Sequence, residues 1–463
     1  MIPLSLADVA TIVGAELHGD PATVVDGPVV TDARECGPGS LFVARVGERA
    51  DGHDFVPQAV QRGAAAALVT RPVEGLASLV VADVQAAFEA LARAVVDRLP
   101  DLKVVAVTGS SGKTSTKDLL AQVLAELGPT VAARESYNSE VGVPLTVLQV
   151  RPQTRYLVVE MGARGVGHIA HACRVVPPDV SVVLNVGSAH LGEFGSVQAV
   201  ADAKSEIVRE LPPEALAVLN ADDPRVRAMA RVTRARVALV GQSTDAAVRA
   251  DDVQLDEQAR ATFTLQAGGR SAPVRLELHG EHHVGNALAV AAVALELGMP
   301  VEDVASALGR ARPVSRWRME VTERPDGVTV VNDAYNANPE SMRAALKALV
   351  AMGRGRRTWA VLGEMLELGA DSVAEHDAIG RMAVRLDVSR LVAVGAGARA
   401  LHTGAVMEGS WGEESVHVPD LESAYELLQR ELREGDVVLL KSSRDAGLRS
   451  LGDRLASGGG VTA

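Results

Sequence analysis

Residues 109–115 have the types and spacing that could hold the phosphates of a nucleotide. Gly109 and Gly112 flank two serines, and Lys113 and Thr114 follow directly. Between a strand and a helix, glycines bring backbone N–H groups close to an anion, and the positive end of the helix faces the same place. We therefore predict an ATP site, with Lys113 at the β- and γ-phosphates and the Thr114 hydroxyl on Mg²⁺. The predicted ATP-binding loop consists of Gly109, Ser110, Ser111, Gly112, Lys113, Thr114 and Ser115.

The flanking sequence supports this interpretation. An apolar run at 104–107 precedes the turn, and helical periodicity at 117–124 follows it. The loop is shorter than the general phosphate-loop pattern, because Val107 stands where that pattern has its first glycine. An ordinary strand-to-helix turn with a chance Lys-Thr pair is the alternative, and the order of strand, loop and helix argues against it. The loop alone does not say what the ATP is used for.

Further polar residues follow other apolar runs. Glu160 comes directly after the run at 156–159, and His190 lies six residues beyond the run at 180–184. Ligands of parallel sheets bind at the carboxyl ends of strands, and oxygen and imidazole donors beside a triphosphate suit Mg²⁺. We predict that Glu160 and His190 join Thr114 at a metal site, with Lys204 nearby at the start of a helix. A plain strand-end carboxylate and a core histidine are the alternatives.

The apolar runs also predict the fold class. Runs at 104–107, 156–159, 180–184, 217–219 and 237–240, the first several separated by helical stretches, indicate a mostly parallel sheet that is covered on both faces. Residues 251–278 are expected to form β-hairpin strands. A β/α alternation recurs after about residue 314. We predict an α/β protein with three domains: 1–98, 99–313 and 314–463.

Composition limits the functional classes. Over 463 residues the formal net charge is −13, and no stripe of Lys and Arg is present, which argues against a nucleic-acid partner. The cysteines Cys36 and Cys173 have no metal-type spacing. We find no basic and apolar leader and no apolar run long enough to span a bilayer. A cytoplasmic protein, with no membrane insertion, is expected.

Several polar segments lack a motif of their own. Asn286, at the expected exposed start of a helix, could bind a base edge or could be a helix cap. Two polar segments of the first domain, 31–34 and 47–55, could be solvated loops. Polar, glycine-containing loops after four expected strands of the third domain predict a binding face, with ordinary connections as the alternative. These loops are 332–339, 363–369, 395–397 and 441–444.

Taken together, these motifs resemble the Mur ligases of peptidoglycan synthesis, over roughly residues 4–455. The shared ATPase core is matched by 108–114, Glu160, 185–190 and Lys204. The resemblance is strongest to the branch that joins D-alanyl-D-alanine to UDP-N-acetylmuramoyl-tripeptide, which the segments 137–144, 332–343 and 363–369 (with His376) carry. This chain has Asn138-Ser139 where the family usually has two asparagines, and Lys441-Ser442-Ser443 where it usually has Lys-Gly-Ser.

The resemblance implies a division of labour. The first domain would bind the UDP-sugar, the central domain ATP, and a Rossmann-like third domain would complete the ATP site and present D-Ala-D-Ala. Lys204 would carry a carbamate that supports a second Mg²⁺. The implied catalytic residues are Lys113, Glu160, His190 and Lys204, and the implied metal-site residues are Thr114, Glu160, His190 and Lys204. Asn286, Arg318 and Asp333 would add to the ATP site. The implied substrate-binding residues are Asp32, Arg34, Asp51, His53, Asn138, Tyr335, Asn336 and Glu364.

The implied activity is ATP-dependent amide-bond formation through an acyl phosphate, by an enzyme that is expected to be a monomer. A related ligase that adds another amino acid, including a folylpolyglutamate type, is one alternative. A nucleotide-binding scaffold without turnover and a motor- or kinase-type ATPase are others. Joint presence of Lys113, Glu160, His190 and Lys204 argues against the scaffold. We find no second acidic strand end to activate water, which argues against the motor or kinase.

Overall fold

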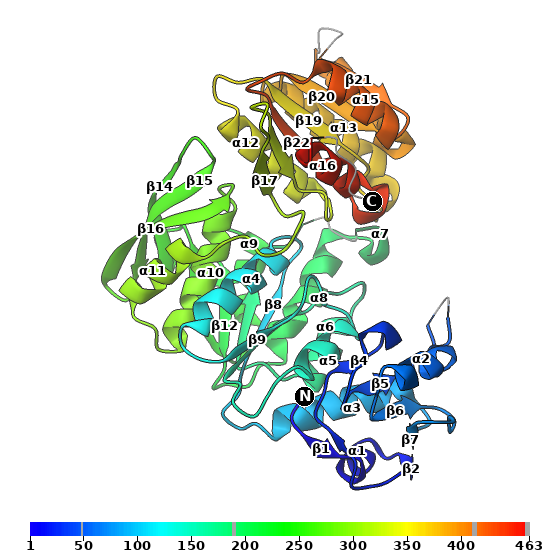
Figure 1. Cartoon of the computed structure of the whole chain (residues 1–463). Coiled ribbons are helices and arrows are strands. Elements are labelled where there is room, and N and C mark those ends of the chain that lie inside the picture. The colour runs from blue at the N-terminus through cyan, green and yellow to red at the C-terminus, as the bar shows by residue number, and fades with distance from the viewer. Residues whose placement is uncertain (48–49, 188–190, 410–413, 459–463) are drawn as a thin grey trace.

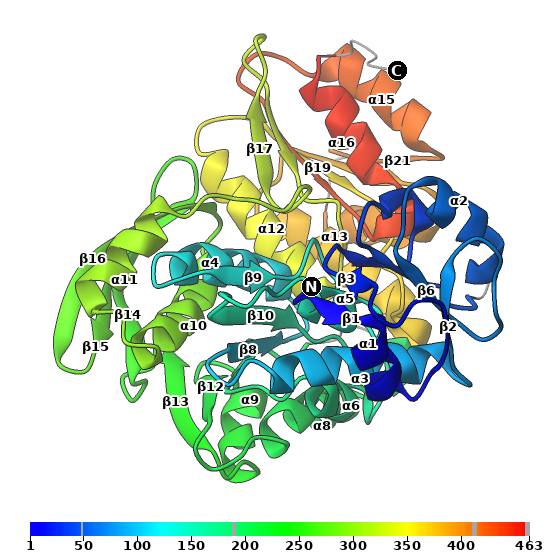
Figure 2. The same cartoon turned by 60° about the horizontal axis from the view of Figure 1, so that its bottom comes forward.

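Three lobes make up the chain, each built on its own β-sheet (Figure 1). The computed structural model describes residues 1–47, 50–187, 191–409 and 414–458. In Figure 1 the first lobe is blue at the lower right, the central lobe is cyan to green, and the third lobe is yellow to red at the top. Helix α3 of the first lobe lies beside the central lobe in both views (Figure 2).

The first lobe has a five-stranded sheet of order β2-β7-β6-β5-β4, beside a two-stranded pair, β1 and β3. Side-chain caps start its two main helices. The Ser5 hydroxyl accepts from the Asp8 amide at the start of α1, and the Asp83 carboxylate caps α3. The elements are β1 (Leu4–Ser5), α1 (Leu6–Val13), β2 (Glu16–His18), β3 (Val24–Val25), β4 (Val29–Val30), η1 (Ala33–Glu35), β5 (Leu41–Val43), η2 (Gly52–Phe55), α2 (Val56–Gln61), β6 (Ala66–Val69), β7 (Ala77–Val80) and α3 (Val84–Asp97).

The central lobe has a nine-stranded sheet of order β16-β15-β14-β13-β12-β11-β8-β10-β9. Strands β8 to β14 pair in parallel with their neighbours, and β14, β15 and β16 pair antiparallel, so the expected hairpin extends the same sheet. The strands are β8 (Lys103–Thr108), β9 (Thr130–Ala132), β10 (Tyr156–Glu160), β11 (Val180–Val183), β12 (Leu216–Asn220), β13 (Arg236–Gly241), β14 (Val248–Leu255), β15 (Arg260–Ala267) and β16 (Arg270–His279). The helices are α4 (Lys113–Ala125), α5 (Gly142–Val147), α6 (His168–Val175), α7 (Leu191–Phe194), α8 (Val197–Arg209), α9 (Pro224–Ala228), η3 (Met229–Arg231), α10 (His283–Glu296) and α11 (Val301–Arg310).

The third lobe has a six-stranded sheet of order β17-β18-β22-β19-β20-β21, parallel except for β17. The strands are β17 (Glu320–Glu323), β18 (Thr329–Asn332), β19 (Thr358–Leu362), β20 (Arg390–Val394), β21 (Ser415–Val418) and β22 (Val437–Lys441). The helices are α12 (Pro339–Met352), η4 (Gly369–Asp371), α13 (Ser372–Arg385), η5 (Ala396–Ala398), α14 (Arg399–Glu408), α15 (Leu421–Glu431), η6 (Arg444–Ala446) and α16 (Leu448–Ala456).

Strand β8 illustrates why a continuous apolar run predicts a buried strand. Val104 and Ala106 face one core, while Val105 and Val107 face the other, so both faces of the sheet are covered. The first of these cores is shared with the first lobe, because Leu6 and Phe88 belong to the same cluster of buried side chains. The third lobe has two cores, on either face of its sheet, and Ala259 of the central lobe joins one of them.

The expected α/β class and the mostly parallel order of the central sheet are confirmed. The runs that predicted β8, β10, β11, β12 and β13 each form a strand. Strands β9, β17 and β21 were not predicted, because they are short and several of their residues are only half-buried, which weakens the apolar signal. The domain boundaries at 98/99 and 313/314 remain a prediction.

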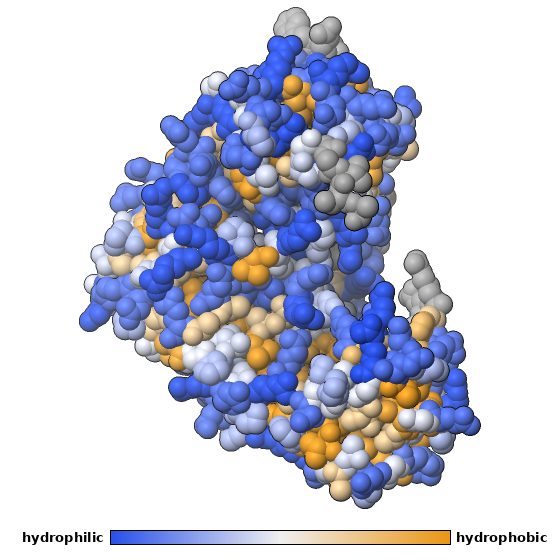
Figure 3. Space-filling view, viewed as in Figure 1, coloured by the Kyte–Doolittle hydropathy of each residue, from blue (hydrophilic) through white to orange (hydrophobic). Residues whose placement is uncertain are grey.

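The surface of the described residues is mostly polar. In Figure 3 hydrophilic residues cover most of the visible face, and apolar residues gather at the lower right, over the first lobe. Among the described helices, none combines the length and the apolar character that crossing a bilayer requires.

The close packing of α13 on α14 generates a prediction. A Cβ at Gly380 would overlap the carbonyl group of Leu401, because the helices approach through this glycine. We expect Gly380→Ala to destabilise the protein by about 1–3 kcal/mol through overpacking, as measured by chemical denaturation. The control is Gly285→Ala in α10, where a Cβ meets open space and a gain of up to about 1 kcal/mol is expected. An equal effect of the two substitutions would contradict this account.

Candidate functional site

The predicted phosphate loop connects β8 to α4 with a backbone that requires glycine. Gly112 has φ +80°, and a Cβ there would lie 2.8 Å from Asn286 Oδ1. Asn185, after β11, holds the loop: its Oδ1 accepts from the Ser111 amide at 2.9 Å, and its Nδ2 donates to the Ser111 carbonyl at 3.2 Å. The loop is therefore fixed by its neighbours and leaves the start of α4 facing a cavity.

Lys113 is folded back onto this loop. Its Nζ donates to the Gly109 carbonyl at 2.7 Å. Burial lowers the pKa of the Lys113 amine, the charge of Arg318 lowers it further, and the charge of Glu160 opposes both. An anion in the cavity would favour the charged amine and give it a stronger partner than a carbonyl oxygen.

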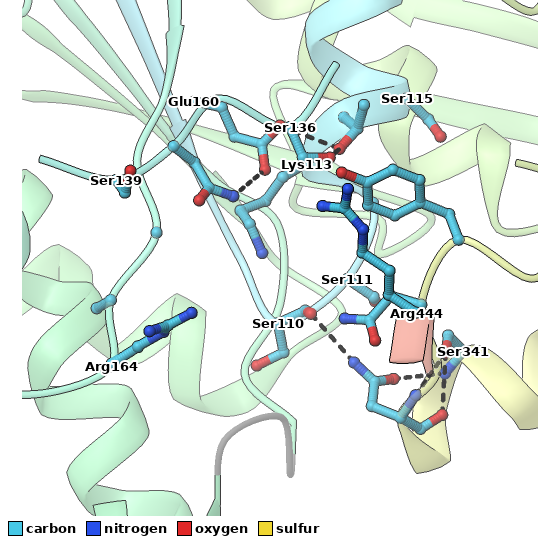
Figure 4. A pocket seen from close by; sticks show the side chains of 18 of the residues that line it. Ser110, Ser111, Lys113, Ser115, Ser136, Ser139, Glu160, Arg164, Ser341 and Arg444 are labelled. Carbon is cyan, nitrogen blue, oxygen red and sulfur yellow. Dashed lines mark hydrogen bonds between the residues drawn. The ribbon is translucent and has the colours of Figure 1, made fainter. Parts of the chain in front are cut away.

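Thr114 and Glu160 meet at the carboxyl ends of β8 and β10. The Thr114 hydroxyl donates to Glu160 Oε2 at 3.0 Å and lies 2.8 Å from the hydroxyl of Ser136. Asn138 Nδ2 donates to the other Glu160 oxygen at 2.7 Å (Figure 4). The carboxylate is nearly inaccessible to solvent. A buried anion, two hydroxyls and an amide thus gather beside the phosphate loop.

Arg318 reaches this cluster from the segment that precedes β17. Its Nη2 donates to the hydroxyls of Thr114 at 3.1 Å and Ser136 at 3.0 Å, and its guanidinium carbon lies 4.2 Å from the centre of the Tyr335 ring. Its Nε is buried and has no hydrogen-bond acceptor among the described residues. A buried donor without an acceptor is costly, so this nitrogen is suited to an anionic ligand.

The donors present fit Mg²⁺. Among the described residues no three His, Cys, Asp or Glu side chains form a cluster that could hold a metal by themselves. Mg²⁺ is commonly bound by one or two carboxylates together with phosphate oxygens and water. The oxygens of Thr114, Ser136 and Glu160 provide such a partial set. His190 lies outside the described residues, so its predicted place at this site stays a prediction.

Lys204 lies at a different place in its helix than expected. It is in the middle of α8 rather than at the start, because the helix begins at Val197 after a Ser196 cap. The side chain lines the cavity, is buried, and has no hydrogen bond or ion pair with the described residues. Burial, and to a smaller extent the charge of Lys113, lowers the pKa of this amine to about 7. A substantial fraction of the amine is therefore neutral at pH 7.

Asn286 was expected at the exposed start of a helix; it does lie at the start of α10, but the expected exposure is wrong. It is buried within the first turns of α10, whose N-cap is His282, and its amide lies against Gly112. The rings of His282 and His283 lie 4.2 Å apart beside it, and burial lowers the pKa of His283 well below its usual value. All three residues line the cavity, so Asn286 still lies at the predicted ATP site.

Asp333 forms a buried ion pair with Lys441 at the ends of β18 and β22. Lys441 Nζ lies 2.6 Å from Asp333 Oδ2 and also donates to the Asn336 carbonyl at 3.0 Å. The other Asp333 oxygen accepts from the Met319 amide at 3.0 Å. Burial lowers the pKa of the Lys441 amine, and the carboxylate opposes this. The pair thus fixes the loop after β18 and the backbone next to Arg318.

These residues surround one cavity of about 1030 Å³ between the central and third lobes. It lies at the carboxyl ends of strands from both sheets, and Figure 4 shows Glu160 and Lys113 across it from Ser341 and Arg444. Asn338 joins the two sides, because its Nδ2 donates to the Ser110 carbonyl at 3.2 Å. The predicted site residues that line the cavity are Ser110, Ser111, Gly112, Lys113, Thr114, Ser115, Asn138, Glu160, Lys204, Asn286, Arg318, Asp333, Tyr335 and Asn336.

Other predicted site residues lie elsewhere. Asp32 and Arg34 form an ion pair at 2.6 Å on the first lobe, and Arg34 lowers the pKa of the Asp32 carboxyl. Asp51 lies 2.6 Å from buried His53, whose Nε2 accepts from the Thr70 amide. Neither of these pairs lines the cavity. Gly109, the first residue of the phosphate loop, does not line it either; its carbonyl accepts from Lys113 Nζ.

Glu364 also lies outside the cavity lining. It follows β19, and its carboxylate packs against Gly397 in the loop after β20. The next residues of this loop do reach the cavity, because Leu366 and Glu367 line it. Three of the four predicted loops of the third lobe therefore reach the cavity, 395–397 does not line it, and a binding face there stays a prediction.

Sequence reasoning missed several residues of the site. Ser136 and Arg164 line the cavity from loops without a motif. Asn338 had a signal that could have been used, since an Asn before Pro-Glu-Ser predicts a helix cap, and it caps α12. Lys441 and Asn185 were noted only as parts of longer motifs.

Comparisons with known proteins agree on one family. Residues 107–294 match the Mur ligase middle domain, 317–444 the Mur ligase glutamate ligase domain, and 28–113 the Mur ligase family catalytic domain. The UDP-N-acetylmuramoyl-tripeptide–D-alanyl-D-alanine ligase of Mycobacterium tuberculosis is 50% identical, over 99% of this chain and 98% of that protein.

Solved structures give the same result. A crystal structure of MurF from Acinetobacter baumannii has a TM-score of 0.89 at 33% identity, covering 98% of this chain and 99% of that one. MurF from Thermotoga maritima in complex with ADP has a TM-score of 0.81 at 30% identity, covering 94% of this chain and 98% of that one.

The Asp333–Lys441 pair generates a prediction. Lys441→Met would leave a buried carboxylate without its cation, so we expect a loss of about 3–5 kcal/mol of stability, measured by urea denaturation. The control is Arg454→Met, which removes an exposed pair with Glu422 and should cost less than about 1 kcal/mol. A loss below about 1 kcal/mol for Lys441→Met would show that the pair is not structural.

Proposed function

This chain belongs to the Mur ligase family, and from that premise we propose how its cavity performs the ligation. The enzyme is an ATP-dependent ligase of peptidoglycan synthesis that joins D-alanyl-D-alanine to UDP-N-acetylmuramoyl-tripeptide, giving the pentapeptide, ADP and phosphate. One observation carries the assignment of the chemistry to this cavity: Lys113, Thr114 and Glu160 of the central lobe converge there with Arg318 of the third-lobe side.

The first step makes the peptide carboxylate reactive. A carboxylate oxygen attacks the γ-phosphorus, the bond from that phosphorus to the β–γ bridging oxygen breaks, and ADP leaves. The two reacting anions repel by about 4 kcal/mol at 4 Å in an effective dielectric of 20. Lys113 and Arg318 are the cations that would offset this repulsion, and the free Nε of Arg318 supplies a donor for a phosphate oxygen.

In the second step the amine of D-Ala-D-Ala attacks the acyl carbon. The bond from that carbon to the phosphate oxygen breaks, phosphate leaves, and the attacking nitrogen loses a proton. Holding both reactants in place can contribute about 7–11 kcal/mol. A cavity between two lobes also keeps water from the acyl phosphate.

We further propose that Thr114, Ser136 and Glu160 hold Mg²⁺ with the nucleotide phosphates, and that His190 adds to this site. When bound, the ion supplies charge neutralisation for the phosphoryl group. Asn286 and Asp333 are proposed to contact the nucleotide, and Asn138, Tyr335 and Asn336 the acyl and amine substrates, whereas Glu364 lies outside the cavity lining. The MurF structure with ADP supports nucleotide binding by this fold.

Lys204 is proposed to carry a carbamate. Its neutral amine can add CO₂: the nitrogen lone pair forms a bond to carbon, one proton leaves the nitrogen, and the product is an anion. The support is threefold: the amine is buried, unpaired among the described residues, and has a pKa of about 7. The carbamate would place a negative charge beside Lys113.

The first lobe is proposed to bind the UDP-sugar, through Asp32, Arg34 and the segment 47–55. Residues 1–98, 99–313 and 314–463 would then be the UDP-sugar, ATP and acceptor domains. These assignments rest on the family and on the separate sheets, since Asp32, Arg34 and the described residues of the segment 47–55 do not line the large cavity. A ligase for another amino acid is disfavoured, because the 50% identical relative is named for D-alanyl-D-alanine.

The ligation is tested with UDP-MurNAc-tripeptide, ATP, Mg²⁺ and D-Ala-D-Ala, followed by mass analysis of the product. We expect the pentapeptide with D-Ala-D-Ala and little product with single amino acids. Lys113→Ala should lower kcat about 100-fold or more, because it removes a cation at the transferred phosphoryl group. Lys347→Ala, an exposed lysine of α12, is the control. Undiminished ligation by Lys113→Ala would refute the site, and efficient use of single amino acids the acceptor.

The carbamate is tested by carbon-13 NMR of the protein in labelled bicarbonate. We expect a carbamate resonance that is lost in Lys204→Arg and kept in Lys103→Arg, an exposed control. The pKa of about 7 sets the pH dependence: above it the amine is neutral and adds CO₂, and below it the amine is protonated, so the signal should fall as pH drops through 7. A signal that survives in Lys204→Arg would rule out this residue as the site.

A further inference from the structure

The backbone on both sides of Arg318 has an unusual conformation. Trp317 has φ +57° and Met319 has φ +50°, so both are left-handed although neither is glycine. A residue held in this region costs on the order of 1–3 kcal/mol and persists only when its surroundings fix it. Arg318, which reaches the Thr114 and Ser136 hydroxyls of the phosphate-loop cluster, therefore lies between two strained residues.

Contacts to the third lobe hold Trp317 in place. Its indole Nε1 donates to both carboxylate oxygens of Asp453, at 3.0 and 3.1 Å, and its amide donates to Glu320 at 2.9 Å. The guanidinium groups of Arg316 and Arg449 lie 4.8 and 5.3 Å from the ring centre. The side chain is thus clamped by polar contacts rather than buried in an apolar core.

Asp453 is the shared acceptor of this clamp. It lies on α16, the last helix of the described chain, and also accepts from Arg316 at 3.1 Å and from Asn332 Nδ2 at 3.2 Å. Asn332 is the last residue of β18, directly before Asp333. One carboxylate therefore ties α16, β18 and the segment around Arg318 together.

Neither Trp317 nor Asp453 lines the cavity, while Arg318 does. On the other side of Arg318, the Met319 amide donates to Asp333 at 3.0 Å, and Tyr335 packs on the guanidinium. The Tyr335 amide donates to the Trp317 carbonyl at 3.2 Å, which joins the loop after β18 to the residue before Arg318. Asp453 can therefore act on the cavity through the backbone that aims Arg318, and also through Asn332, which precedes Asp333.

We propose that Asp453 is a positioning residue for the ligation: by holding the Trp317 indole, it fixes the strained backbone that aims Arg318 at the phosphate loop. This inference rests on the proposed role of Arg318 at the ATP phosphates. Without the Asp453 acceptor, residues 317–319 can relax toward ordinary φ values. The guanidinium then spends less time at Thr114. Ordering it again costs conformational entropy during nucleotide binding and phosphoryl transfer.

The experiment is a double-mutant cycle on the full-length enzyme. Asp453→Ala is expected to lower kcat/KM for ATP about tenfold, within the range for directly coupled residues. In an Arg318→Ala background the same substitution should have little further effect, because the residue that it positions is gone. Trp317→Phe, which keeps a ring but lacks the indole N–H, should resemble Asp453→Ala. Glu422→Ala, which removes an exposed ion pair to the same helix, is the matched control.

A second readout covers variants with too little activity to measure. Affinity for ADP, measured by calorimetry, should fall with Asp453→Ala in the wild-type background and stay unchanged in the Arg318→Ala background. Equal losses in the two backgrounds would mean that Asp453 acts only on the stability of the third lobe, and no loss in either would mean that it positions nothing. Failure of the wild-type enzyme to ligate D-Ala-D-Ala would instead count against the proposed function, and the ADP cycle would still decide this inference.

Discussion

One contact between two lobes organises the site: the Arg318 guanidinium lies against the hydroxyls of Thr114 and Ser136. This contact joins a cation of the third lobe to the start of α4, the helix that follows the phosphate loop. The bonds from Asn338 to the Ser110 carbonyl and from the Gly192 amide to the Glu367 carbonyl also join the two lobes. Because the carboxyl ends of strands in both sheets face this cavity, the chemistry depends on how these two edges meet.

The electrostatics of the cavity are those of a site built for anions. Burial lowers the pKa values of the Lys113, Lys204 and Lys441 amines, and Arg318 Nε has no acceptor among the described residues. Burying cations without counter-charges is unfavourable, and Glu160 and Asp333 offset only part of it. A triphosphate, a peptide carboxylate and a lysine carbamate would each supply negative charge where the folded chain lacks it.

The sequence predicted the phosphate loop, the Glu160 strand end and the sheets well, because each depends on a local pattern. Long apolar runs indicate buried strands, and a glycine turn before Lys-Thr indicates a tight connection from a strand to a helix. Local pattern could not show that Asn286 is buried against Gly112, since that depends on how α10 packs on α4. Nor could it reveal Ser136, whose position at the Arg318 contact is set entirely by tertiary structure. Asp32 and His53, whose roles rest on the family alone, do not line the cavity.

The core shared by the first and central lobes has a consequence for substrate length. Leu6 and Phe88 belong with Val104 to one apolar cluster, so the first two sheets share a core, whereas of the central lobe only Ala259 joins the cores of the third lobe. If the sugar nucleotide is anchored on the first lobe, the span from that anchor to the phosphate loop is constant. A stem peptide one residue shorter would then reach less far from that anchor toward the phosphate loop, whatever the chemistry of its last residue.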